Sequence, residues 1–165
     1  MKRFIKKLLF HIATLNLLFI SPVMAESQKI KFPLSRDKIS VIIEAIERTR
    51  KHTHSKYDVL LEDCGDPLFR KQIFQNATWK TVEPSNVVEK NYRKANFREY
   101  FDKTSGKRIE KINVRLESVS SKKILIEVFS DTHTSTVSGA HSMRYTYRRI
   151  NGKWVLKEEK LGIVS

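Results

Sequence analysis

The sequence is poor in the residues that crosslink or punctuate small domains, with one cysteine, five glycines and four prolines in 165 residues. A disulfide within the chain needs two cysteines, so Cys64 cannot form one, and a disulfide-stapled scaffold is excluded. We expect Cys64 to be a buried, inert thiol beside an apolar run, with an intermolecular bridge or a reactive thiol as the alternatives.

Motifs that would indicate catalysis or a bound cofactor are also missing. The chain has no glycine-rich phosphate loop, no Gly-x-Ser-x-Gly elbow and no Cys-His signature. His133 and His141 lie near Asp131 in the polar segment SDTHTSTVSGAHS, but no third ligand is clustered with them. We therefore predict no metal, no cofactor and no catalytic set, and this polar segment is expected to be a loop that contacts a partner.

Long apolar runs are absent except at the N-terminus. There MKRFIKK precedes LLFHIATLNLLFI, and SPVMA places Val23 and Ala25 at the small-residue positions of a cleavage site. The run is too short for a membrane anchor, and His11 and Asn16 interrupt it. We predict a signal peptide over residues 1–25, cleaved after Ala25, and one domain over 26–165. A lysine-rich leader of this kind is typical of bacteria, so the protein is expected to be periplasmic or secreted.

Acidic residues are outnumbered, because 32 lysines and arginines stand against 18 aspartates and glutamates, for a net charge of +14. Most of the excess beyond the leader lies after residue 86. Such a field favours an acidic protein partner or an anionic ligand. Export argues against a nucleic-acid role, whereas contact with an anionic membrane surface needs no spanning segment.

The residue pattern in the first half of the chain predicts helices. Ser35 is a helix cap followed by an isoleucine stripe at helical spacing, and the stripe can continue through Leu60 and Leu61 to Cys64, as one helix or two. Asp66 and Pro67 suit the cap and first position of a second helix, LFRKQIFQN. A short helix is also expected over residues 87–94.

From there on the pattern alternates as in strands. FREYFDKTSGKRIEKINV predicts a strand, a turn and a strand, and INVRLESV and ILIEVF predict the arms of the next hairpin. Glu127 interrupts the second apolar face of ILIEVF, and we expect it to face solvent or to pair with a lysine, with burial in a cavity as the alternative.

The last hairpin can be derived residue by residue. Asn151 and Gly152 are the preferred pair for a two-residue turn, since both positions need positive φ. Counting back from the turn places Tyr147 opposite Leu156 and Tyr145 opposite Glu158. An apolar face then carries Met143, Tyr145, Tyr147, Trp154 and Leu156, and a basic face carries Arg144, Arg148, Lys153, Lys157 and Glu159.

The segments YDVLLEDCGDPLFRKQIF and MRYTYRRINGKWVLKEE resemble the nuclear transport factor two superfamily. The resemblance implies an α+β fold with N-terminal helices packed on a curved antiparallel β-sheet. A cystatin-like helix wrapped by a meander is the alternative. The superfamily includes enzymes, binding modules and exported immunity proteins that neutralise toxins, and its sheets often pair into homodimers, so the fold alone leaves function open.

Two candidate sites follow. We expect a ligand pocket lined by Tyr57, His141, Met143, Tyr145, Tyr147 and Trp154. We expect a partner-binding surface made by Asp131, His133, Arg144, Arg148, Lys153 and Lys157. The favoured function is an exported, non-enzymatic binding protein of the immunity type that binds an acidic partner such as a toxin. A small-ligand binder or an isomerase-like pocket enzyme of the same fold is the alternative.

Overall fold

The structure is a computed structural model and describes residues 30–62, 66–92, 97–133 and 138–162. The expected signal peptide, Cys64 and the centre of the polar loop, residues 134–137, lie outside the described residues. The described elements, in chain order, are α2 (Arg36–His52), β1 (Asp58–Glu62), α3 (Pro67–Asn76), the 3-10 turn η1 (Pro84–Asn86), β2 (Val87–Tyr92), β3 (Phe97–Asp102), β4 (Arg108–Val119), β5 (Lys123–His133), β6 (Ser138–Ile150) and β7 (Lys153–Leu161).

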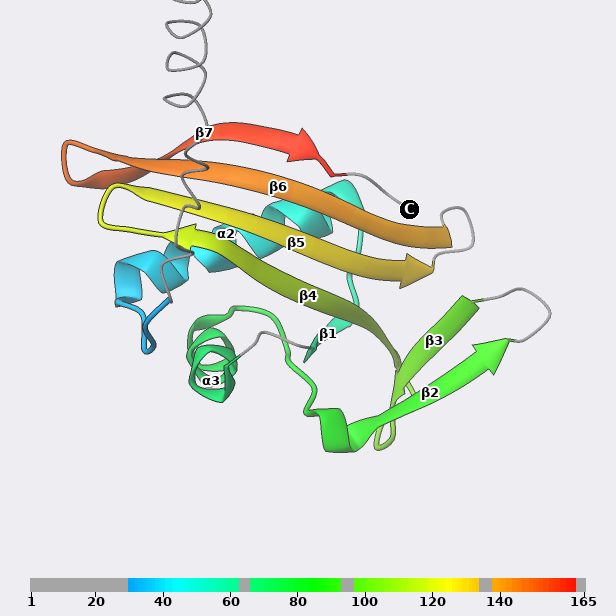
Figure 1. Ribbon diagram of the computed structural model, residues 1–165. Coiled ribbons are helices and arrows are strands. Elements are labelled where there is room, and N and C mark those ends of the chain that lie inside the picture. The colour runs from blue at the N-terminus through cyan, green and yellow to red at the C-terminus, as the bar shows by residue number, and fades with distance from the viewer. Residues whose placement is uncertain (1–29, 63–65, 93–96, 134–137, 163–165) are drawn as a thin grey trace, which may run out of the picture.

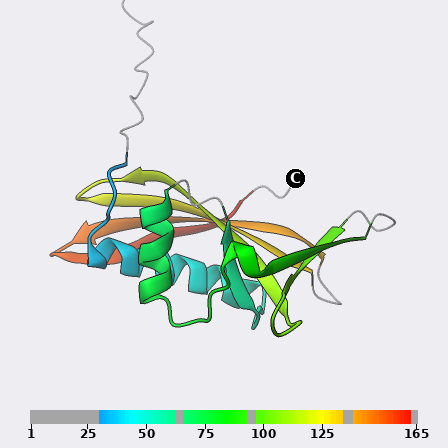
Figure 2. The ribbon, with the colours of Figure 1, turned by 90° about the horizontal axis from the view of Figure 1, so that it is seen from below.

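The described chain is an α+β fold in which helices lie on one side of an open sheet. Strands β2 to β7 pair in sequence order as antiparallel neighbours, and β1 adds to β4 in parallel. Figures 1 and 2 show the sheet as one twisted layer with α2 and α3 on the same side of it. This agrees with the expected class of helices packed on an antiparallel sheet.

Helix α2 forms because its isoleucines recur on one face, and that face is buried against β5 and β6. Ile39, Ile42 and Ile46 are fully buried, and each contributes about 2 kcal/mol by leaving water. Ser35 occupies the expected cap position, but its hydroxyl donates to Asp37 and makes no side-chain cap.

The helix ends before the apolar stripe does. The Ser55 N–H donates to the Arg50 carbonyl at 3.0 Å, and the His54 N–H donates to the Lys51 carbonyl at 3.2 Å. These are the paired bonds of a Schellman motif, with His54 at its left-handed position with φ of 51°. The predicted continuation of the helix to Cys64 is therefore wrong, because residues 58–62 form β1.

Strand β1 is buried on both faces. Val59 and Leu61 belong to the main core under α2, whereas Leu60 packs into a second cluster with Tyr100 and Ile109. A short apolar run of this kind fits a helix and a doubly buried strand equally well. The short helix predicted over 87–94 is wrong for a similar reason, since Val87–Tyr92 form β2.

Helix α3 begins as expected. The Asp66 carboxylate accepts the N–H groups of Leu68 and Phe69, and Pro67 occupies the first turn. Phe69 and Ile73 are fully buried. The Gln72 side chain bonds both the N–H and the carbonyl of Leu34, at 2.9 and 2.7 Å, which ties α3 to the segment entering α2.

The strands predicted for β3, β4 and β5 are confirmed, and the last hairpin is partly confirmed. Asn151 and Gly152 form the turn with positive φ, and Tyr147 lies opposite Leu156 as derived. Beyond that pair the derived register is wrong by one residue, because an irregularity puts Thr146 opposite Glu158 and Tyr145 opposite Glu159.

The extra residue in β7 changes which side Glu159 occupies. Glu159 faces α2 instead of the basic side. Its carboxylate pairs there with His52 of α2 and lies 3.6 Å from Arg48. A β-bulge of one residue reverses the faces of everything that follows it, which a count from the turn cannot detect.

Candidate functional site

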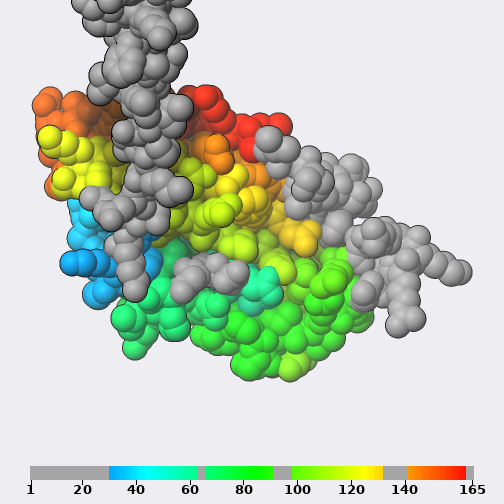
Figure 3. Space-filling model, in the orientation of Figure 1, coloured from blue at the N-terminus to red at the C-terminus, as the bar shows by residue number. Residues whose placement is uncertain are grey.

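The sheet face opposite α2 is the first candidate surface. On β5 and β6 the residues that alternate with the buried core positions point to this face, and none of the described helices covers it (Figure 2). In Figure 3 the atoms of β4 to β7, from yellow-green to red, occupy the upper part of the view, above the cyan and green atoms of the segments before β4. We call the sheet face opposite α2 the outer face.

A cluster at the hairpin end of the outer face combines unpaired cations with exposed apolar side chains. Lys123 on β5 lies directly opposite Arg148 on β6, and Arg148 lies opposite Val155. Ile150 and Val155 are 39% and 38% exposed, large fractions for such residues. With Lys153, which lies opposite Ile150, these residues form the outer basic patch: Lys123, Arg148, Ile150, Lys153 and Val155.

The outer basic patch brings like charges close together. Within the described part of the chain, Lys123, Arg148 and Lys153 form no ion pair. Like charges placed directly across two strands destabilise a sheet by up to about 1 kcal/mol. Among the described residues the Glu158 carboxylate interacts with the charge of Lys123, but it pairs with Lys160 instead. An acidic group from another molecule would relieve the remaining repulsion.

Arg144, another residue of the predicted partner surface, is already engaged. Its guanidinium lies 2.9 Å from the Glu117 carboxylate and 3.7 Å from that of Glu127. Glu127 is only 7% exposed and accepts the Ser142 hydroxyl at 2.9 Å. The expectation that Glu127 faces solvent or pairs with a lysine is therefore wrong, because an arginine and a serine bury it on the outer face.

The remaining residues of that predicted surface are scattered. Lys157 is exposed where the β7 register shifts. Asp131 is half-buried and lines a shallow depression with Tyr57 and Arg108. The side chain of His133, at the end of β5, lies outside the described residues. The outer basic patch therefore joins Arg148 and Lys153 to Lys123, which sequence reasoning did not select.

A second candidate site is a pocket of about 320 Å³ between the end of α2 and strands β6 and β7. His141 and Met143, both predicted as pocket residues, line it. The Nε2 atom of His141 is buried without a hydrogen-bond partner among the described residues. The other lining residues are His52, Thr53 and Leu161. The pocket thus offers an apolar wall and one unsatisfied imidazole nitrogen.

The predicted pocket tyrosines lie deeper, in the core. Tyr145 and Tyr147 are 0% and 1% exposed. Burial raises the pKa of Tyr145 to about 12, although the Thr49 hydroxyl at 2.9 Å from its own acts in the opposite direction. Burial raises the pKa of Tyr147 further. Both phenols are therefore neutral at ordinary pH and pack between sheet and helix.

Tyr57 and Trp154, the other predicted pocket residues, lie at separate surfaces. The Tyr57 ring lies 5.5 Å from the guanidinium carbon of Arg108. The Trp154 indole N–H donates to Asp37 at 3.1 Å, which fastens β7 to the start of α2. Hydrogen bonds from Ser35 and then Trp154 lower the pKa of Asp37. Of the six predicted pocket residues, the structure brings only His141 and Met143 together in one pocket.

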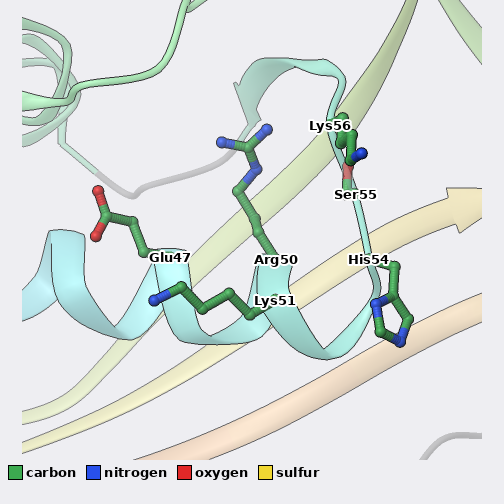
Figure 4. Close-up of a pocket in the computed structure, with 6 residues that line it drawn as sticks. All are labelled: Glu47, Arg50, Lys51, His54, Ser55 and Lys56. Carbon is green, nitrogen blue, oxygen red and sulfur yellow. The ribbon is translucent and has the colours of Figure 1, made fainter.

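A third site, missed by sequence reasoning, lies where α2 leads into β1. Figure 4 shows Glu47, Arg50 and Lys51 projecting from the helix, with His54, Ser55 and Lys56 on the segment that leads from the helix end to β1. They line a pocket of about 380 Å³. We call it the helix-end pocket; its lining residues are Glu47, Arg50, Lys51, His54, Ser55 and Lys56.

Arg50 is fixed in the helix-end pocket by a buried polar network. Its Nε donates at 2.9 Å to Glu110, which is fully buried, and its Nη2 donates to the Tyr57 carbonyl. The second Glu110 oxygen accepts the Ser130 hydroxyl at 2.6 Å. The Trp79 ring lies 5.5 Å from the Arg50 guanidinium carbon. Glu110 alternates along β4 with the buried Ile112 and Val114 and so points to the same, core-facing side of the sheet. A carboxylate among buried apolar positions is the sequence signal that could have indicated this network.

None of these sites has the arrangement of a metal centre in the part of the chain that the structure describes. Among the described residues, no group of three or more histidine, cysteine, aspartate and glutamate side chains could hold a metal ion. No described helix is long and apolar enough to cross a membrane. The sites can bind through charge, hydrogen bonds and apolar contact.

Comparison with known proteins found no match for this chain among protein-family models, curated proteins or solved structures. The case for function therefore depends on the geometry of these sites.

Proposed function

We propose that this protein is an exported, non-enzymatic binding protein that docks an acidic protein partner on its outer basic patch. The observation that carries the proposal is the Lys123–Arg148 pair, two exposed cations set directly opposite each other, neither of which forms an ion pair with an acidic side chain among the described residues. A sheet that keeps this repulsion while exposing Ile150 and Val155 beside it has the features of a docking surface: apolar contact surrounded by charge.

The partner's chemistry follows from this surface. Complementary charge speeds encounter and rejects wrong partners, and the apolar pair supplies contact area that water would otherwise cover. A partner with carboxylates around a small apolar knob fits. A toxin whose acidic cleft is covered by this face is the immunity form of the proposal, and the resemblance to the nuclear transport factor two superfamily supports that form.

The test is capture of a partner by the tagged protein, purified after export, from envelope and secreted proteins of its source. We expect one stoichiometric acidic protein that is released as salt rises, because salt screens exposed charges over roughly 8–10 Å. Arg148→Glu and Lys153→Glu should abolish capture. The matched controls Lys71→Glu and Lys107→Glu reverse exposed charges elsewhere and should retain it.

Two results would count against the proposal. Equal loss of capture in the patch variants and in the controls would mean that net charge alone attracts proteins. Recovery of the protein itself alone, as a homodimer, would show that a second copy occupies the outer face.

A small-ligand role is the second candidate, and the unsatisfied Nε2 of His141 favours it. A ligand with an apolar body and one hydrogen-bonding group would satisfy that nitrogen inside the pocket of about 320 Å³. A thermal-shift screen should give hits that His141→Phe abolishes and Arg148→Glu leaves intact. Hits unaffected by His141→Phe would exclude this pocket.

A further inference from the structure

The helix-end pocket gathers more positive charge than the protein itself uses. Arg50, Lys51 and Lys56 line it together with one carboxylate, that of Glu47. Glu47 accepts the Thr78 hydroxyl at 3.0 Å, whereas Lys51 and Lys56 form no ion pair with any described residue. The Nη1 group of Arg50 also has no partner in the described part of the chain, since Nε and Nη2 make all its bonds.

One hydroxyl beside these cations has no partner among the described residues. The Ser55 hydroxyl is buried and has no hydrogen-bond partner among the described residues. Buried polar groups are almost always bonded, and one that is not indicates a missing partner. A guanidinium N–H pair, two ammonium groups and a hydroxyl suit an acceptor with several oxygens and negative charge.

The backbone of this pocket is held in a costly conformation. His54 takes the left-handed position of the Schellman motif, with φ of 51°, where glycine is the usual residue because a Cβ is strained there. His54 is one of the residues that line the pocket. Strained residues gather at functional sites, and an imidazole kept where glycine would be more stable is explained if it contacts a ligand.

We propose that the helix-end pocket binds a phosphate group, carried by free phosphate, a small phosphorylated molecule or an anionic phospholipid headgroup. The volume of about 380 Å³ accommodates a phosphate with a small organic body. Lys51 and Lys56 supply point charges, Arg50 is held in place by Glu110, and Ser55 and His54 supply further donors. The pocket lies on the helix side of the sheet, so this proposal is independent of the outer basic patch.

The test is a titration of the protein, purified after export, with inorganic phosphate at constant ionic strength, followed by NMR shifts of residues 47–56. We expect saturable binding. Lys51→Gln and Lys56→Gln should each weaken it about tenfold, the usual effect of one charge-assisted bond. Lys71→Gln, which removes an exposed charge on α3, should leave affinity unchanged.

His54→Gly separates a binding role from a structural one. It should raise the midpoint of denaturation while it weakens phosphate binding. Unchanged binding in His54→Gly would overturn the role assigned to the imidazole.

A parallel arm uses vesicles containing phosphatidylglycerol. Vesicle binding with the same pattern among variants, but no response to free phosphate, would identify a lipid headgroup as the source. No binding in either arm, or equal loss in Lys71→Gln, would overturn the proposal and leave the outer basic patch untouched.

Discussion

Replacing Glu110 by glutamine is expected to destabilise the protein severely, although the two side chains have nearly the same shape. The Glu110 carboxylate is fully buried, and the Arg50 side chain beside it is 13% exposed. In Glu110→Gln the amide oxygen can still accept the Arg50 Nε–H, but the guanidinium loses its compensating charge and is left with neutral partners, the Tyr57 carbonyl and the Trp79 ring among them. Removing one member of a buried ion pair costs about 3–5 kcal/mol, because the other charge stays desolvated and uncompensated.

The lower end of that range applies here, since Arg50 retains some contact with water. We expect a loss of about 3 kcal/mol in the free energy of unfolding. With a urea slope of about 2 kcal/mol per molar, the midpoint of urea denaturation should fall by roughly 1.5 M. The matched control is Glu89→Gln, which breaks an exposed pair with Arg98 at 3.4 Å and should cost less than about 1 kcal/mol.

The double replacement Arg50→Met with Glu110→Met tests the mechanism. Exchanging a whole buried pair for apolar residues is often neutral, so this variant should recover most of the stability lost in Glu110→Gln. If Glu110→Gln lost no more than Glu89→Gln, the view that Glu110 compensates a buried charge would be refuted. If the double variant were less stable than the single one, the network would stabilise beyond charge compensation.

Two further predictions concern ionisation and backbone strain. Tyr145 and Tyr147 should ionise later than an unperturbed tyrosine in an absorbance titration at alkaline pH. Because burial raises their pKa, the folded state holds more protons than the unfolded chain above pH ~10, and stability should fall as pH rises from there towards about 12. Tyr145→Phe should remove one late-ionising group, and an alkaline stability curve identical to that of the unchanged protein would contradict this account. His54→Gly should raise the free energy of unfolding by about 1 kcal/mol, because glycine relieves the left-handed strain. Gly152→Ala, at φ of 77°, should lower the free energy of unfolding by a similar amount. Chemical denaturation measures both changes, and two changes in the same direction would show that the strain argument fails.

Local chemistry decided which parts of the fold the sequence could predict. Asp66 and Pro67 mark a helix start, and Asn151 and Gly152 mark a hairpin turn, because these residues act on their own backbone. Strand β1 could not be predicted in this way. Its apolar residues fit a helix as well, and its assignment depends on a parallel pairing with β4 that lies far along the chain.

The candidate sites also differ in whether neighbouring residues or distant segments of the chain form them. His141 and Met143 are two positions apart on one strand, so alternation alone predicts that they share a surface. Arg50 and Glu110 are 60 positions apart, and only the packing of α2 against the sheet brings them together. Lys123 faces Arg148 through strand pairing between β5 and β6, which a search for clustered charges along the sequence does not detect.

The bulge in β7 shows how one residue can mislead a derivation that is otherwise sound, and it yields a test. Tyr147 pairs with Leu156 and Thr146 with Glu158, so Lys157 is the residue in excess. Deleting Lys157 should leave Glu158 and Glu159 opposite their present partners, and the free energy of unfolding should change by less than about 1 kcal/mol. Deleting Val155 instead would turn Leu156 out of the core and should cost about 2 kcal/mol. Equal losses in the two deletions, measured by urea denaturation, would show that Lys157 does not absorb the shift in register.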